Sequence, residues 1–148
     1  MHVTLQNEAF DPGANLNAFI AGRENAGAAV SFVGTVRSSA NKPVETLTLE
    51  HYAVLAQRQI EKFVQQALTK FDLIDIQVTH RFGTLKRGDI IVQVLALSAH
   101  RQAAFDGANY VMDWLKTDAP FWKQEKSADG THWVSSRAQD EAAKDKWR

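Results

Sequence analysis

IIVQVLALSAHR, residues 90–101, is the stretch that carries the most information about the fold. Apolar residues from Ile90 to Leu97 occupy both faces of an extended chain, a pattern typical of a strand that is covered on both sides. We therefore predict a strand over 89–99 at the centre of a sheet. The polar residues that follow lead into a helix predicted over 101–116, whose buried stripe is expected to contain Phe105, Ala108, Met112 and Leu115.

The chain before this strand alternates between strand and helix patterns. Strands are predicted over 2–6, 28–37, 45–52 and 74–82. A helix over 16–24 is expected to follow a turn at Asp11-Pro12-Gly13 and to be capped by Asn15. Gly34, inside a predicted strand, indicates a bulge or a close backbone approach. A second helix, over 54–71, has the clearest apolar stripe, formed by Ala56, Ile60, Phe63, Val64, Ala67, Leu68 and Phe71.

After the helix over 101–116, Pro120 prevents the helix from continuing, because proline has no N–H to donate. FWKQEK (121–126) and HWVSS (132–136) are predicted to be two short strands joined by a turn centred on Asp129-Gly130. The charged tail, 138–148, is either helical or frayed. Strands and helices in this order predict an α+β protein, a single domain over 1–148 in which helices pack on a largely antiparallel sheet.

The composition limits the classes of function. Lys and Arg number 17, as do Asp and Glu, so there is no overall attraction to nucleic acid or to an anionic membrane. The chain has no cysteine, which excludes disulfides and a cysteine nucleophile, and its five histidines have no HExxH-like spacing, so neither a metal nor a cofactor is expected. No apolar run approaches the ~18 residues of a membrane span, and the N-terminus lacks a signal-peptide pattern, so we expect a cytoplasmic location.

Three basic clusters are candidates for a site. Arg37 follows a predicted strand and is either a functional group or an ordinary solvated residue. His100 and Arg101 begin a predicted helix, where free N–H groups bind anions, although Ser98 or His100 could simply cap the helix. Lys116 and Lys123 lie on either side of Pro120. The two lysines can meet only if the chain turns at 118–120, a geometry that the sequence permits without requiring it.

Several motifs together resemble one known family. FVGTVR (32–37), LTLEHY (47–52), HRFGTLKRGD (80–89), SAHR (98–101) and LKTDAPFWKQE (115–125) are similar, in order and spacing, to the catalytic large subunit of molybdopterin synthase. The resemblance extends from about residue 27 to the end. It implies an α/β hammerhead-type fold with a small additional β-subdomain. It also implies a sulfur transfer to cyclic pyranopterin monophosphate, which forms the dithiolene of molybdopterin in molybdenum cofactor biosynthesis.

The resemblance also implies partners and roles for particular residues. The sulfur comes from the C-terminal thiocarboxylate of a small ubiquitin-like subunit, and two such subunits flank a central homodimer of the large one to form a heterotetramer. The paired catalytic lysines of the family fall on Lys116 and Lys123, and some contacts are expected to reach the neighbouring protomer's pocket. Substrate contacts fall on Thr35, Val36, Arg37, His100, Arg101, Gln124, Glu125 and Arg137. Many relatives have a second basic residue where Gln124 stands, so a charge contact at that position is not expected.

Two other classes of function are compatible with the residues alone. An α+β domain with aromatic strands and basic clusters could be a binding module for a phosphorylated ligand or RNA. Against RNA, the basic residues are clustered rather than arranged in a stripe, and the aromatic-basic RNP motif is missing. The third class is a scaffold for the small subunit that has lost its activity, against which the retained lysine pair argues.

Overall fold

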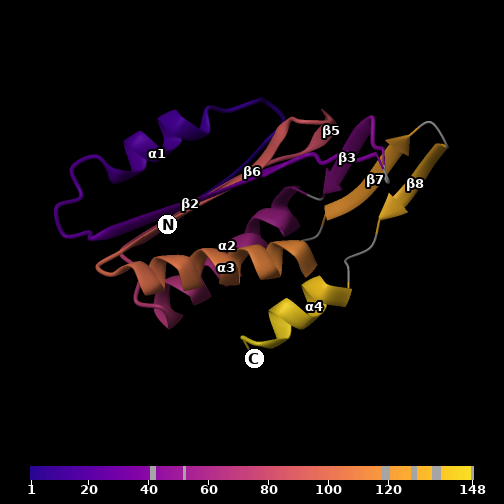
Figure 1. The fold of residues 1–148 in the computed structure, drawn as a ribbon. Coiled ribbons are helices and arrows are strands. Elements are labelled where there is room, and N and C mark those ends of the chain that lie inside the picture. The colour runs from indigo at the N-terminus through magenta and orange to yellow at the C-terminus, as the bar shows by residue number, and fades with distance from the viewer. Residues whose placement is uncertain (41–42, 52, 118–120, 128–129, 135–137, 148) are drawn as a thin grey trace.

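The structure is a computed structural model that describes residues 1–40, 43–51, 53–117, 121–127, 130–134 and 138–147, with the backbone alone at 50–51, 53, 121–125, 132–134 and 138–140. The described residues form two four-stranded sheets with helices packed around the first of them (Figure 1). The predicted α+β class, with a largely antiparallel arrangement, is confirmed. None of the described helices is both long and apolar enough to cross a membrane.

The first sheet has the strand order β1 (His2–Gln6), β4 (Asp75–Arg81), β6 (Ile90–Ser98) and β2 (Ala28–Thr35). β1 runs parallel to β4, and the other neighbouring strands are antiparallel. β6 lies between β4 and β2 and is buried from Val92 to Ser98, which confirms the central strand predicted from its apolar run. Alternate side chains of β6 therefore supply two separate cores.

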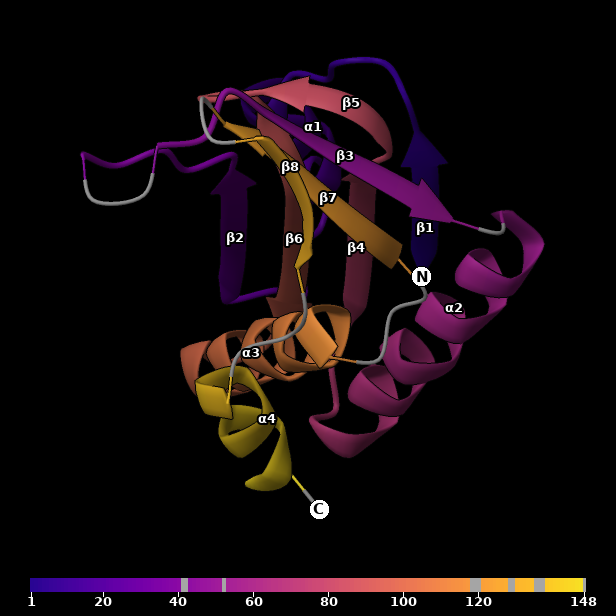
Figure 2. The same cartoon turned by 90° about the vertical axis from the view of Figure 1, so that its right-hand side faces the viewer.

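Helices cover both faces of this sheet. α2 (Ala53–Lys70) and α3 (Arg101–Thr117) lie together on one face, and α1 (Pro12–Ile20) lies on the other (Figures 1 and 2). On the α2–α3 side, Val94 and Ala96 of β6 are fully buried, whereas Leu95 and Leu97 pack toward Phe19 of α1. The apolar stripe predicted for the long helix is confirmed, since Ala56, Ile60, Phe63, Val64 and Ala67 are all 2% exposed or less.

Two details of the helices differ from the predictions. α1 begins at Pro12 rather than at residue 16, because Asp11 caps it: its carboxylate accepts from the Ala14 N–H at 3.1 Å, and proline is well suited to the first helical position. Phe105, predicted on the buried stripe of α3, is 53% exposed. The stripe runs instead through Ala104, Ala108, Val111 and Leu115, which places Phe105 about 100° around the helix from its neighbour at 104.

The second sheet is entirely antiparallel, with the order β5 (Gly83–Lys86), β3 (Thr46–His51), β7 (Phe121–Ser127) and β8 (Gly130–Val134). The predicted hairpin is confirmed by the pairing of β7 with β8. β5 was not predicted, because its four residues, GTLK, include a single apolar one and so show no alternating pattern. Gly83, at a φ of 89°, is the point where the chain leaves β4 of the first sheet and enters β5 of the second.

The two sheets meet at a seam with its own small core. Val36, Val44, Leu49 and Leu85 are each 4% exposed or less and pack together there. The bulge predicted at Gly34 is confirmed by a register shift between Gly34 and Thr35, after which the chain leaves β2. The end of β2 and the turn between β5 and β6 therefore lie at fixed positions in the seam.

The C-terminal segment forms a short helix, α4 (Ala138–Asp145), which packs against α3. Trp147, just after it, donates from Nε1 to the carboxylate of Asp113 at 2.5 Å. Its ring contacts Phe71 and Tyr110 edge-on, with centroids 5.4 and 5.8 Å away. The tail is thus helical rather than frayed where it is described, and it is attached to the helix that leads to the seam.

Candidate functional site: a cationic cavity at the seam

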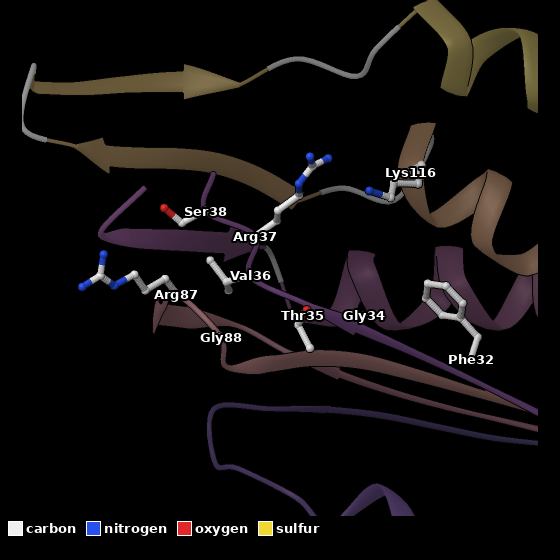
Figure 3. Close-up of a pocket in the computed structure, with 9 residues that line it drawn as sticks. All are labelled: Phe32, Gly34, Thr35, Val36, Arg37, Ser38, Arg87, Gly88 and Lys116. Atoms are coloured by element: carbon white, nitrogen blue, oxygen red, sulfur yellow. The ribbon is translucent and has the colours of Figure 1, made fainter. Parts of the chain in front are cut away.

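A cavity of about 710 Å³ opens at the seam between the sheets (Figure 3). We call it the outer cavity, and its volume lies within the ~300–1,000 Å³ range of small-molecule sites. Its residues come from the end of β2, the β5–β6 turn and the last turn of α3. They are Phe32, Gly34, Thr35, Val36, Arg37, Ser38, Arg87, Gly88 and Lys116.

Backbone hydrogen bonds hold the β2 end of the outer cavity in place. The Val36 N–H donates to the Asp89 carbonyl at 2.9 Å, and the Gly88 N–H donates to the Val36 carbonyl at 2.8 Å. The Val36 side chain is 4% exposed in the seam core, whereas its neighbours Thr35 and Arg37 are exposed. The buried Val36 thus fixes the backbone next to Arg37, whose exposed guanidinium lines the cavity.

A smaller cavity of about 100 Å³, the inner cavity, adjoins the outer one. Both are lined by Phe32, Gly34, Thr35 and Lys116, and the inner one continues between the sheets against Leu47, Leu49, His80, Ile91, Val92, Met112 and Leu115. His80 is 7% exposed, and its Nδ1 lies 2.7 Å from the Arg81 carbonyl. Because a carbonyl only accepts, Nδ1 carries the proton. Lys116 therefore lies where a polar, open space meets a narrow apolar one.

The outer cavity is cationic. Arg37, Arg87 and Lys116 line it, and none of the described residues in its lining is acidic. Among the described residues, no carboxylate forms an ion pair with any of these three cations; the ion pairs found there, such as Arg23 with Asp75 at 2.6 Å, lie elsewhere. No cluster of three or more His, Asp or Glu suited to a metal is found in that part of the chain either. Uncompensated cations around one cavity favour an anionic ligand.

His100 and Arg101 do not line either cavity. They lie at the N-terminal end of α3, while Lys116 lies in its last turn, about 22 Å away by the helical rise of 1.5 Å per residue. Ser98 is buried, and its hydroxyl donates to the His100 carbonyl rather than capping an N–H of the helix. Within one chain, the structure therefore separates this predicted cluster from the other two.

The backbone of β7 runs beside the inner cavity. Lys123 pairs with Leu49, Gln124 with Thr48 and Glu125 with Leu47 in the antiparallel register, and both leucines line the inner cavity. The side chains at 123–125, the turn at 118–120 and Arg137 lie outside the described residues. The convergence of the two lysines thus remains a prediction, as does a contact from Arg137.

Several lining residues were not among the predicted site residues. Arg87 and Gly88 belong to HRFGTLKRGD and Phe32 to FVGTVR, but these three residues were not expected to contact the substrate, and Ser38 lies just after the predicted strand over 28–37. The available signal was the pair of basic residues in LKRGD, next to a glycine. The sequence alone does not show that this turn forms hydrogen bonds with Val36. It therefore could not predict that Arg87 and Arg37 line the same cavity.

The fold and the site define a class: an α+β protein of two packed sheets with a cationic, anion-accepting cavity at their seam. The MoaE protein family matches residues 5–118, and a molybdopterin synthase catalytic subunit from Pseudomonas aeruginosa is 45% identical over 148 residues, 99% of each chain. The chain belongs to the MoaE protein family. Its resemblance to the molybdopterin synthase large subunit, inferred from the motifs, is confirmed.

Solved structures share the architecture. The Molybdopterin biosynthesis MoaE protein from Burkholderia ambifaria superimposes with a TM-score of 0.83 at 39% identity, covering 99% of this chain and 97% of that one. A protein–protein complex of subunits 1 and 2 of the molybdopterin-converting factor from Helicobacter pylori gives a TM-score of 0.74 at 23% identity, covering 91% of each chain. The second likeness concerns the fold alone.

Proposed function

We propose that this protein is the catalytic subunit of molybdopterin synthase, an enzyme of molybdenum cofactor biosynthesis. In this proposal it is a sulfurtransferase that moves sulfur from the C-terminal thiocarboxylate of a small ubiquitin-like subunit to cyclic pyranopterin monophosphate. The observation that carries the proposal is the outer cavity: Arg37, Arg87 and Lys116 face one space, and the described residues that line it include no acidic one, in a member of the MoaE family. Both reactants are anions, and such a cavity favours them.

Lys116 and Lys123 are proposed to perform the acid–base chemistry. The thiocarboxylate sulfur forms a bond to a side-chain carbon of the pterin, and the oxygen that it replaces takes a proton as it departs. Water then cleaves the bond between sulfur and acyl carbon, which releases the small subunit as a carboxylate. A lysine ammonium can supply the first proton and stabilise the oxyanion of the second step. Lys116 is placed for this role because it lies where the two cavities meet.

His100 and Arg101 are proposed to act in the site of a second copy of the chain. β2 is an edge strand, and Phe32 and Val33 on it are each 39% exposed. Since Ala28 pairs with Ser98, the start of β2 lies beside the residues that lead into α3. Antiparallel pairing of β2 with its counterpart would bring the α3 N-terminus of one copy toward the Thr35 end of the other. A homodimer arranged in this way would place His100 and Arg101 of one copy near the outer cavity of the other, as the predicted site requires.

The remaining substrate contacts, from Thr35, Val36, Gln124, Glu125 and Arg137, are proposed on the family resemblance. Thr35 and Val36 have the additional support that they line the outer cavity. The small subunit is proposed as the partner because the chain belongs to this family, and the H. pylori neighbour is itself a two-subunit complex.

Reconstitution tests the function. Purified protein, thiocarboxylated small subunit and the cyclic pterin are expected to yield molybdopterin, detected as its oxidised fluorescent derivative. Lys116→Ala and Lys123→Ala should each lower turnover at least about 100-fold, the usual contribution of general acid–base catalysis. Lys70→Ala is the matched control, because Lys70 is also exposed in the last turn of a helix but lines neither cavity. No product with the wild-type protein, or tight salt-sensitive binding of single-stranded RNA instead, would contradict the proposal.

Intersubunit complementation tests the shared site. Co-expression of Lys116→Ala with Arg101→Ala is expected to give heterodimers with one intact site, made from the unmodified Lys116 of one chain and the unmodified Arg101 of the other. Activity should then return, although each variant alone is inactive. If both residues served the same chain's site, every site in the heterodimer would carry a lesion and activity would stay absent.

A further inference from the structure

Arg87 lines the outer cavity but has no counterpart among the expected substrate contacts. It lies in the turn between β5 and β6, and its side chain is exposed. Arg37 and Lys116 extend toward each other at one end of the cavity, whereas Arg87 extends the other way, from the far side of Val36 (Figure 3). The cavity therefore has two cationic ends. Among the described residues, the one placed in the chemistry, Lys116, lies at the Arg37 end.

The turn that carries Arg87 is held in place. The Asp89 carboxylate accepts from the Lys86 N–H at 2.9 Å, and the Asp89 N–H donates to the Lys86 carbonyl at 3.0 Å. The Arg87 N–H donates to the Glu45 carbonyl at 3.3 Å, and Gly88 completes the turn at a φ of 87°. Since Gly88 and Asp89 also form backbone hydrogen bonds with Val36, the backbones of Arg87 and Arg37 are at fixed relative positions. This placement is built into the fold.

The guanidinium of Arg87 is also available for a ligand. In the described part of the chain, no carboxylate forms an ion pair with it. The nearest acidic side chain in sequence, Asp89, is engaged by a backbone N–H of the same turn. A guanidinium presents a planar fork of donors that fits two oxygens of a phosphate. An exposed, unpaired arginine at the rim of a cationic cavity attracts anions and raises their rate of association.

We propose that Arg87 captures the phosphate of the pterin substrate at the entrance of the outer cavity, before the substrate moves to Arg37 and Lys116. This inference rests on the proposed function, in which two anions use the cavity. The thiocarboxylate sulfur must reach the reacting carbons near Lys116, at the opposite end from Arg87. The phosphate is therefore the anion that remains for Arg87. The residue acts in binding and specificity, and it does not contact the reacting atoms.

Arg87→Ala and Lys86→Ala make a matched pair for the test. Both remove one positive charge from the same turn, but Lys86 is exposed and lines neither cavity. With the small subunit saturating, Arg87→Ala is expected to lower kcat/KM for the pterin by about tenfold, the effect of one charge-assisted hydrogen bond, and to leave kcat unchanged. The deficit should shrink as salt rises to ~1 M, where the screening length falls to about 3 Å. Lys86→Ala should behave like wild type.

Two further measurements separate this role from the alternatives. With the pterin saturating, the KM for the small subunit should be the same for Arg87→Ala and wild type; a rise in that KM would assign Arg87 to the thiocarboxylate partner and overturn the proposal. Calorimetric titration without the small subunit should show that wild type prefers the phosphorylated pterin over its dephosphorylated form more strongly than Arg87→Ala does. Equal preferences, a lower kcat, or identical kinetics for Arg87→Ala and Lys86→Ala would each refute the inference. An inactive wild-type protein would instead contradict the proposed function.

Discussion

Gly34 gives the sharpest test of how closely the site is packed. It lies at the bulge of β2 and lines both cavities. A Cβ at this position would lie 2.7 Å from Cγ1 of Val92 and 3.4 Å from the ring of Phe32. Val92 is 6% exposed and belongs to the main core, so it cannot move into solvent. We expect Gly34→Ala to force a shift in the core.

The expected change in the free energy of unfolding of Gly34→Ala is the difference between two opposing effects. Overpacking a core costs about 1–3 kcal/mol, and replacing glycine by alanine regains about 0.4–1 kcal/mol because the unfolded chain loses freedom. Gly34→Ala should therefore lower the free energy of unfolding by roughly 1–2 kcal/mol. Val92→Ala alone loses two buried methyl groups, for about 1–3 kcal/mol. In the double variant the missing Cγ1 leaves room for the new methyl group, so the loss should be at least about 1 kcal/mol smaller than the sum.

The assay is urea unfolding of the four proteins, followed by far-ultraviolet circular dichroism at 25 °C. Gly13→Ala is the control, because its Cβ would meet only Asp11 Oδ1 at 3.4 Å, an ordinary contact, inside helix α1. That change should be neutral or stabilising by about 0.5 kcal/mol. If Gly34→Ala were as stable as wild type and its effect simply added to that of Val92→Ala, the close-packing argument would be wrong.

Two other predictions concern contacts outside the site. Burial raises the pKa of Asp75, but hydrogen bonds from the N-terminal ammonium, Arg23 and a backbone N–H outweigh burial and hold that pKa below its usual value. The stabilisation from these contacts is therefore full above about pH 5 and lost as pH falls through the folded-state pKa. The free energy of unfolding of Asp75→Asn should accordingly be lower than that of wild type near neutral pH, and the difference should vanish in acid. Trp147→Phe removes the Nε1 donor to Asp113 and should lower the free energy of unfolding by about 1–3 kcal/mol. Faster amide exchange over 141–147 would locate the loss in α4, and unchanged exchange there would show that this bond does not hold the helix.

Local patterns predicted most of the elements because they depend on short-range physics. The apolar run from Ile90 to Leu97 predicts a central strand, since a strand covered on both faces needs no polar side. The stripe of α2 and the Asp129-Gly130 turn likewise predict their elements from spacing and backbone preference. Phe105 shows the limit: a helical stripe predicts that one face is buried, but neighbouring elements decide where that face ends.

The α+β class, the family and the basic residues that are candidates for the site all follow from the order of the amino acids. The way in which Arg87 joins those residues follows from the fold, because it depends on contacts between segments far apart in the chain. The hydrogen bonds that Val36 accepts from Gly88 and donates to Asp89 bring Arg87 into the cavity that contains Arg37. The separation of Arg101 from Lys116, in contrast, already follows from the predicted helix over 101–116, which places the two residues at its opposite ends. The grouping of Arg87 with Arg37 does not follow from local pattern, since it depends on where the two sheets meet.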